Sequence, residues 1–257
     1  MRFASLGSGS NGNGLVVERL TTRLLMDCGF GLRDAVQRLA RLALNPADIT
    51  GILVTHEHDD HAGGVFKFAS KHGIPVWLTH GTWRMSQRYL PASSALDITL
   101  IDSHQHFTIG DLEITPFPVP HDAREPVQYT FSDGQHKLGV LTDTGTSTPH
   151  IEQMLSACHG LVLECNHDLE MLANGPYAWP LKQRVGSRLG HLDNDSAARL
   201  LAKLDNSKLQ HLIAAHLSAK NNSPALARDA LSQALGCSAE WIGIADQETG
   251  FDWRQLG

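Results

Sequence analysis

The densest group of chemically active side chains follows a short β-rich run at residues 51–55. His56 and His58 are two positions apart, so in an extended chain both side chains lie on one face and can reach the same metal ion. Asp60 and His61 come next, in a turn from which they can reach a second ion. Burying these groups without a metal would leave uncompensated polar atoms at a cost of several kcal/mol. The pattern His-x-His-x-Asp-His therefore predicts a metal centre.

Six residues cannot complete two coordination spheres, so further ligands are expected at the ends of later strands. His121, Asp143 and His216 each follow a short apolar run, which is where a sheet passes its chain to the rim of an active site. Singly, each would be an ordinary loop residue. Together with the histidine cluster they form a consistent ligand set. The chain has 4 Cys and no Cys-x-x-Cys pair, so imidazole and carboxylate are the expected ligands.

The composition limits the class of protein. The chain has 257 residues, of which 42% are hydrophobic, and this is enough for one packed domain spanning 1–257. It has neither an apolar run long enough to span a bilayer nor a secretory signal, so we expect a cytoplasmic protein with no membrane contact. The net charge of −6 is poor for wrapping nucleic acid. It does not exclude a nuclease that holds one strand with metals and a few local basic residues.

The elements that must position these residues follow from hydrophobic periodicity and turn signals. Short β-like runs separated by polar turns come first, and strands then alternate with helices. This order predicts layered sheets flanked by helices, with the chemistry on loops after the strands. The last helix is well marked, because Ser223 and Pro224 suit its start and Gly236 suits its end. The expected strands are 15–17, 24–26, 51–55, 98–101, 112–119, 128–131, 138–141, 161–163 and 212–215, and the expected helices are 32–42, 195–204 and 224–235.

With these motifs, nearly the whole chain resembles the metallo-β-lactamase superfamily. The resemblance implies an α/β fold, a four-layered αβ/βα sandwich with a dinuclear metal centre between its halves. Asp27, in Leu-Met-Asp-Cys-Gly, would orient ligands through hydrogen bonds. By the resemblance His56, His58 and His121 hold the first metal, Asp60, His61 and His216 hold the second, and Asp143 bridges them.

Within the superfamily the chain is similar to the small bacterial YycJ/WalJ-like proteins, which are related to ribonuclease Z and the β-CASP nucleases. Four stretches carry this likeness: 8–13, 164–168, 190–194 and 215–224. The chain departs from the family at Asp193, where Ser is usual, and near Gly14, where Cys or Ser is usual. Asp193 would add negative charge near the expected phosphate site. The resemblance implies a 5′ to 3′ exonuclease that acts on DNA.

The expected mechanism needs no protein nucleophile. Two divalent ions would lower the pKa of a bridging water, and the resulting hydroxide would attack a phosphodiester while Asp60 orients it. His191 is the candidate acid that protonates the leaving oxygen, with Glu164 holding it as the imidazolium. Resemblance to ribonuclease Z implies the same pair. The alternative for His191 is a structural residue at the start of the helix that follows.

Residues near these motifs are candidates for substrate binding. Arg184 and Arg188 belong to the densest basic run in the chain and could contact a phosphate backbone, or they could lie on a solvated helix face. Ser10 and Asn11 lie in a Gly-rich turn that could offer backbone N–H groups to a phosphate. Ser218 follows His216 and could touch substrate or cap a helix. His167 could face the pocket or point away from it.

Several questions stay open at this level. Zn²⁺ is the expected metal of the pair, with Mn²⁺ or Fe²⁺ as alternatives, because mixed nitrogen and oxygen sites accept several ions. DNA is favoured over RNA as the substrate, and a homo-oligomer is an open alternative to a monomer. A small-molecule hydrolase that opens a thioester or lactone, like glyoxalase II or the lactonases, is the alternative activity, since it would use the same metal-binding string.

Overall fold

The computed structural model of the chain describes residues 1–91 and 96–257. Within these residues the strands form two seven-stranded sheets. The strands of the first sheet are β1 Arg2–Gly7, β2 Gly14–Arg19, β3 Thr22–Met26, β4 Gly51–Leu53, β5 Val76–Thr79, β6 Ile98–Ile101 and β14 Phe251–Gln255. Those of the second are β7 Phe107–Ile109, β8 Leu112–Pro118, β9 Val127–Ser132, β10 Lys137–Leu141, β11 Gly160–Glu164, β12 His211–Ala215 and β13 Gly243–Ile244. The strand orders are β14-β1-β2-β3-β4-β5-β6 and β13-β12-β11-β10-β9-β8-β7.

Both sheets are buried on their two faces, and the sequence divides its apolar side chains between them. In β3, Leu24 packs between the two sheets, whereas its neighbour Leu25 packs under the helices of the first sheet. In β11, Val162 lies between the sheets and Leu163 faces the helices of the second sheet. Because side chains alternate along a strand, continuous apolar runs supply three hydrophobic cores at once.

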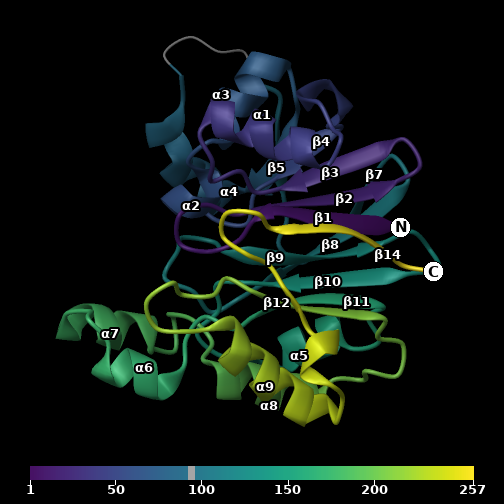
Figure 1. Cartoon of the computed structure of the whole chain (residues 1–257). Helices are drawn as coiled ribbons and strands as arrows, with labels where there is room; N and C mark the ends of the chain where they lie inside the picture. Colours follow the sequence, from purple (N-terminus) through teal and green to yellow (C-terminus); the bar gives the residue numbers. More distant parts are fainter. Residues whose placement is uncertain (92–95) are drawn as a thin grey trace.

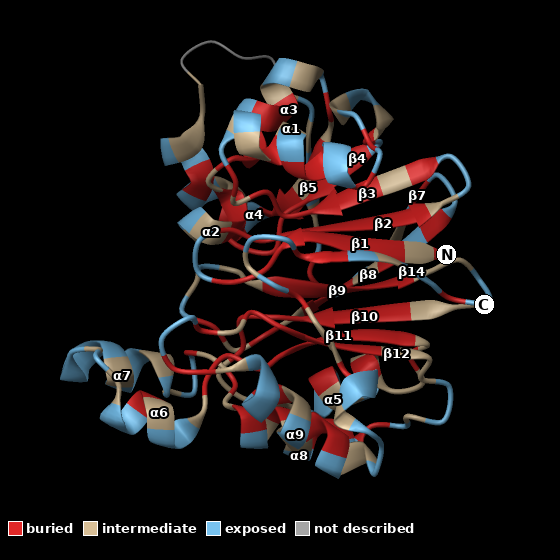
Figure 2. Ribbon diagram, in the orientation of Figure 1, coloured by how far each residue is buried: buried red, intermediate tan, exposed pale blue. Residues whose placement is uncertain are grey.

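Helices cover the outer face of each sheet (Figure 1). On the first sheet these are chiefly α1 and α3, and on the second they are α5, α8 and α9. Their buried residues face the sheets and their exposed residues face outward (Figure 2). The order helix, sheet, sheet, helix confirms the predicted αβ/βα sandwich. The helices are α1 Leu32–Arg41, α2 Asp59–Ala62, α3 Val65–His72, α4 His80–Met85, α5 Pro149–Leu155, α6 Leu169–Asn174, α7 Trp179–Val185, α8 Asn194–Lys203 and α9 Pro224–Leu235, with 3₁₀ turns at Pro46–Asp48, Ser86–Tyr89 and Ala239–Trp241.

Two local predictions can be compared directly with the structure. Helix α9 has the predicted boundaries, because the Ser223 hydroxyl accepts a hydrogen bond from the Leu226 N–H and Gly236 adopts φ 64°. The strand predicted over 51–55 ends earlier, at Leu53. Thr55 was predicted to end this strand, but its N–H donates to the Asp27 carboxylate at 2.8 Å instead of to a neighbouring strand.

The loops that follow β3, β4, β8, β10, β11 and β12 all lie at one edge of the sandwich, opposite the two termini (Figure 1). β3 and β4 are parallel to each other, as are β10, β11 and β12. Parallel strands bring their carboxyl ends to the same edge. Helices α6 and α7, which periodicity did not predict, project from the second half beside this edge. Within the described ranges, no helix is both long and apolar enough to cross a membrane.

Candidate metal centre

The histidine cluster is formed where β4 gives way to a single helical turn. His56 and His58 lie in the extended segment, and His58 occupies the position before α2. Asp60 and His61 lie on α2, where a simple turn was expected. The His61 N–H donates to the His58 carbonyl at 3.1 Å. This turn brings all four side chains to the edge where the strands end.

Three imidazoles face one point. The His56 Nε2 atom lies 3.0 Å from the His58 Nδ1 atom, and the His121 Nε2 atom lies 3.2 Å from the same Nδ1. Burial lowers the pKa of both His56 and His121, and neighbouring imidazoles lower it further. Neutral imidazole is the form that binds a metal ion. These nitrogens therefore fit one divalent cation, as sequence reasoning expected of this set.

A second group lies beside the first. The Asp60 Oδ2 atom is 3.4 Å from the His216 Nε2 atom and 3.5 Å from the His61 Nε2 atom. Asp143 reaches both, with Oδ2 2.9 Å from His61 Nε2 and Oδ1 3.6 Å from His216 Nε2. Asp143 also groups with His56, so it lies between the two sets.

One detail of the second group points to a cation. The Asp143 Oδ2 atom is buried, and its 2.9 Å contact with His61 Nε2 lacks hydrogen-bond geometry, with no other partner among the described residues. A buried carboxylate oxygen without a well-formed hydrogen bond is costly, and a divalent cation would compensate it. The donor set of imidazole nitrogens and carboxylate oxygens suits zinc, manganese or iron.

Hydrogen bonds fix the orientation of the proposed ligands. The Asp27 carboxylate lies 2.8 Å from His61 Nδ1 and accepts bonds of 2.8 Å from both the N–H and the hydroxyl of Thr55. His121 Nδ1 lies 3.1 Å from the Gly190 carbonyl oxygen. Each contact leaves the opposite nitrogen of its ring free to face the centre.

The backbone at three of these positions is strained. Asp27, Asp143 and His216 have φ values of 61°, 51° and 55°, in the left-handed region that non-glycine residues rarely adopt. Each comes at or just beyond the end of a strand. Such residues cost about 1–3 kcal/mol each, and they persist where the surroundings hold them. The sharp turn directs each side chain away from the sheet and into the cluster.

Glu164 and His191 form the predicted pair. The His191 Nδ1 atom is 2.8 Å from Glu164 Oε1, while Glu164 Oε2 accepts bonds from the Thr144 and Leu192 N–H groups at 3.0 and 3.1 Å. Burial alone would raise the pKa of Glu164, but His191 and His216 outweigh it and lower it to about 2. Burial lowers the pKa of His191, and the Glu164 and Asp143 carboxylates more than reverse this. The side chains of Glu164, His191, Asp143 and His216 also lie close enough together to hold a metal ion themselves.

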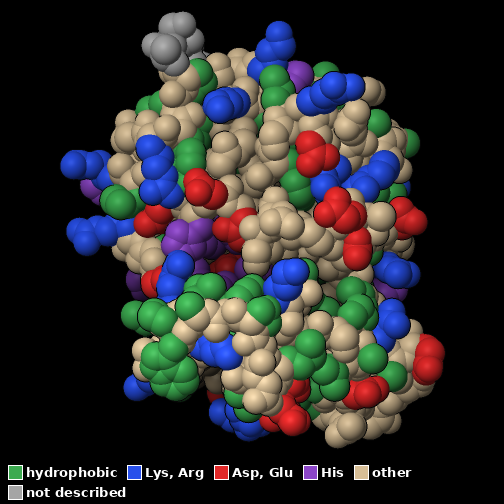
Figure 3. Space-filling model, turned by 60° about the vertical axis from the view of Figure 1, so that its left-hand side comes forward, with side chains coloured by type: hydrophobic (Ala, Val, Ile, Leu, Met, Phe, Trp, Pro, Cys, Tyr) green, Lys and Arg blue, Asp and Glu red, His purple; other side chains and the backbone are tan. Residues whose placement is uncertain are grey.

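A pocket of about 450 Å³ opens above the cluster. Figure 3 shows the histidines at the bottom of a hollow between the two halves of the molecule, with basic and acidic side chains around it. Ser10 and Arg184 line this pocket, as expected of substrate contacts. Asn11, Arg188 and Ser218 are not among its lining residues. The Asn11 N–H instead donates to the Gln247 side chain at 2.9 Å.

Ser218, a candidate substrate contact, does not line the pocket. Its side chain is buried, and its hydroxyl accepts a hydrogen bond from the Asn221 N–H at 3.2 Å, within the loop after β12. The bond stabilises the loop that carries His216. His167, left open by the sequence, is buried next to Asn166 and does not line the pocket.

Asp193 also differs from expectation. It does not add charge to the pocket, because its carboxylate caps α8, accepting bonds from the N–H and hydroxyl of Ser196 at 2.7 and 2.6 Å. The helix cap considered as an alternative for His191 therefore belongs to Asp193, while His191 faces the pocket.

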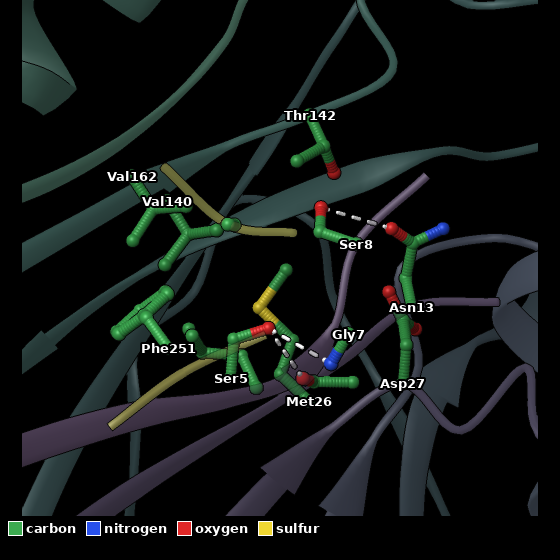
Figure 4. Close-up of a pocket in the computed structure, with 13 residues that line it drawn as sticks. Ser5, Gly7, Ser8, Asn13, Met26, Asp27, Val140, Thr142, Val162 and Phe251 are labelled. Atoms are coloured by element: carbon green, nitrogen blue, oxygen red, sulfur yellow. Dashed lines mark hydrogen bonds between the residues drawn. The ribbon is translucent and has the colours of Figure 1, made fainter. Parts of the chain in front are cut away.

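The Gly-rich turn after β1 acts on the ligands through a side chain rather than through its backbone. The Asn13 amide nitrogen lies 3.3 Å from Asp60 Oδ2 and 3.1 Å from His61 Nε2. On its other side, Asn13 accepts a bond from the Ser8 hydroxyl at 3.2 Å, beside an internal cavity of about 30 Å³ (Figure 4). This cavity lies between the sheets and is roughly the size for one water molecule.

Seven residues that line the pocket were not assigned to the site from the sequence: Asp59, Arg88, Asp122, Tyr177, Leu181, Val185 and Gly190. Asp122 Oδ1 lies 3.5 Å from His121 Nε2, and its Oδ2 accepts a 2.6 Å bond from Arg184 Nε. A carboxylate directly after a proposed ligand was the available signal. No such signal marks Arg88, which comes from the 3₁₀ turn at Ser86–Tyr89.

Comparisons with known proteins agree with this description. A family model described as a beta-lactamase superfamily domain matches residues 22–216. Exodeoxyribonuclease YycJ of Bacillus anthracis is 37% identical over 248 residues, covering 95% of this chain and 93% of that protein. Exodeoxyribonuclease WalJ of Streptococcus pneumoniae is 33% identical, covering 95% and 91%. The metallo-beta-lactamase fold protein YhfI from Bacillus subtilis superposes with a TM-score of 0.77 at 16% identity, covering 98% of each chain. The chain belongs to the beta-lactamase superfamily, and within it to the relatives of YycJ and WalJ.

Proposed function

We propose that this chain is a dinuclear-metal-dependent phosphodiesterase that degrades DNA from the 5′ end. The observation that carries the proposal is the convergence of seven ligand-type side chains, together with the Glu164–His191 pair, at one pocket of about 450 Å³. The relatives that this chain matches over nearly their full length are named exodeoxyribonucleases, which supports DNA as the substrate.

The ligand set of the proposal is His56, His58 and His121 for one ion, Asp60, His61 and His216 for the other, and Asp143 between them. When bound, two divalent ions supply an acidified water and neutralise the charge of a phosphodiester. We propose zinc as the metal, with manganese or iron as alternatives that the same donor atoms accept.

The chain's own residues then have distinct tasks. Asp60 is half-buried at the edge of the pocket and accepts a hydrogen bond from the attacking water, which orients it. Arg184 is held by Asp122 and lines the pocket, where its guanidinium contacts a phosphate. Ser10, on the opposite loop, contacts the same strand.

His191 donates the proton that the departing oxygen requires. Its side chain is 21% exposed toward the pocket, whereas the Glu164 side chain that holds it is fully buried. A His paired with a buried carboxylate is oriented through Nδ1, so Nε2 is free to face the substrate. The pair favours phosphodiester cleavage over thioester hydrolysis, because a departing alkoxide needs a proton more than a thiolate does.

Digestion of DNA tests the proposal. Metal-loaded protein should release nucleotides from 5′-phosphorylated DNA, and the double variant Asp60→Ala/His61→Ala should release none. A matched control is Asp102→Ala/His104→Ala, an exposed Asp–His pair 3.7 Å apart outside the pocket, which should leave the rate unchanged. Equal activity in the Asp60/His61 variant would mean that the activity comes from elsewhere.

Replacing His191 with Ala should separate its role from that of a ligand. The variant should keep its full metal content and cleave DNA at least about 100-fold more slowly. A nucleotide p-nitrophenyl ester, whose leaving group departs without a proton, should be cleaved at close to the normal rate. Metal analysis and the two substrates check this. If metal is lost and both substrates slow down equally, His191 is a ligand and not the acid.

A further inference from the structure

The lining of the pocket combines two chemistries. Its basic side chains are Arg88, from the 3₁₀ turn at Ser86–Tyr89, and Arg184, from α7. Tyr177, Leu181 and Val185 form an apolar and aromatic wall, and Leu181 and Val185 lie on the same helix as Arg184. Leu181 and Val185 are four positions apart on α7, so they share one face of that helix. Nothing in the proposed hydrolysis of a phosphodiester uses this apolar wall.

The α6–α7 segment that carries the wall is unusual for this chain. Between residues 169 and 189 it has three basic residues and one acidic residue, although the chain as a whole has a net charge of −6. It also exposes large apolar side chains, Leu181 at 39% and Trp179 at 70%. Figure 3 shows hydrophobic side chains gathered just below the hollow that holds the histidines. Exposed apolar surface next to positive charge is what a single nucleic-acid strand requires.

We propose that Tyr177, Leu181 and Val185 form a nucleobase subsite, where the base of the nucleotide next to the scissile phosphate lies. This inference rests on the proposed function, and it assigns a binding site to the nucleobase, which the proposed function left without one. Phosphates then lie toward Arg88 and Arg184, which line the same pocket. The pocket volume of about 450 Å³ lies within the usual range for small-ligand sites, about 300–1,000 Å³. Such contact tolerates any base, because every base has a flat π-face.

The test compares two single-stranded substrates that differ only in the base of the terminal nucleotide, one intact and one abasic. For the unmodified protein kcat/KM should be about tenfold higher on the intact substrate. Tyr177→Ala should bring this ratio close to one by raising KM on the intact substrate alone. Tyr177→Phe keeps the ring and should keep the ratio. Binding of the same two oligonucleotides to metal-free protein, followed by fluorescence anisotropy, should show the same pattern.

Two further variants serve as matched controls for Tyr177→Ala. Trp241→Ala removes an indole that is 42% exposed on a different surface and should not change the ratio. Leu181→Ala should lower the ratio without loss of thermal stability. The inference is overturned if Tyr177→Ala keeps the tenfold ratio, or if it lowers both substrates equally.

Failure of the subsite can be told apart from failure of the proposed function. If the unmodified protein releases nucleotides from neither substrate, the proposed function fails, whatever Tyr177 does. If Tyr177→Ala converts a dimer into a monomer by sedimentation and leaves the ratio unchanged, the apolar wall is a contact between copies and the nucleobase subsite is wrong.

Discussion

Replacing Asp143 with Asn should lower DNA cleavage about a thousandfold and reduce the bound metal from two ions per chain to one or none. The Asp143 Oδ2 atom is buried, and its 2.9 Å contact with His61 Nε2 lacks hydrogen-bond geometry. An amide has one carbonyl oxygen and an NH₂ group, so it cannot offer two ligand atoms to two ions. The proposed metal pair would supply several kcal/mol of transition-state stabilisation, which corresponds to a rate loss of this order.

A second buried carboxylate provides the control. The Asp133 side chain is also fully buried, but it pairs with Arg19 and with the main-chain amine of Met1. Asp133→Asn should lower stability while both metal ions and the cleavage rate per folded molecule are retained. Metal analysis and nuclease rates of the two variants show whether the loss is specific to Asp143 or common to any buried carboxylate. An Asp143→Asn protein with two ions and normal activity would show that Asp143 does not lie between the metals.

Replacing Asp27 with Ala should weaken metal binding about 10- to 100-fold and destabilise the fold by about 3 kcal/mol or more. Asp27 does not line the pocket of about 450 Å³, and it acts through its neighbours. Its carboxylate satisfies His61 Nδ1 and both donors of Thr55 at 2.8 Å. The loss of three buried bonds leaves their donors without partners, and Ala is also disfavoured at φ 61°.

The variant Asp27→Asn separates these two effects. Asn tolerates the left-handed backbone and keeps one acceptor oxygen, so most of the stability should remain. Its NH₂ group would face donors, so His61 should still be misoriented and metal affinity should still fall. Denaturant unfolding and metal titration measure the two quantities separately. If Asp27→Asn binds metal normally, orientation of His61 by this carboxylate is not needed.

Much of the fold could be predicted because it depends on local patterns. Leu24 and Leu25 belong to an apolar run whose alternation is visible in the sequence, and Ser223 and Gly236 mark the ends of a helix by their own side-chain and backbone preferences. Helices α6 and α7 lacked such a signal, because they are short and α7 buries no residue completely. Their position depends on contacts with distant loops.

The proposed ligands could be located from the sequence because parallel strands bring their ends to one edge, so residues far apart in sequence come together. The substrate contacts were harder to predict from the sequence, because nearness to a motif in the sequence does not determine which way a side chain points. Arg184 and Arg188 are four positions apart, yet only Arg184 lines the pocket, because the chain leaves α7 at Val185. Asp193 was assigned to the pocket by proximity and instead caps α8. The left-handed backbone at Asp143 could not be predicted, because only the surrounding structure holds it there.

We propose that two metal ions held by these residues act together on DNA. The most direct measurement adds known equivalents of Mn²⁺ or Zn²⁺ to metal-free protein and follows nucleotide release from 5′-phosphorylated DNA. The rate should stay low up to one ion per chain and reach its plateau at two, with release beginning at the 5′ end. A plateau at one ion, or no release at any metal content, would contradict this proposal.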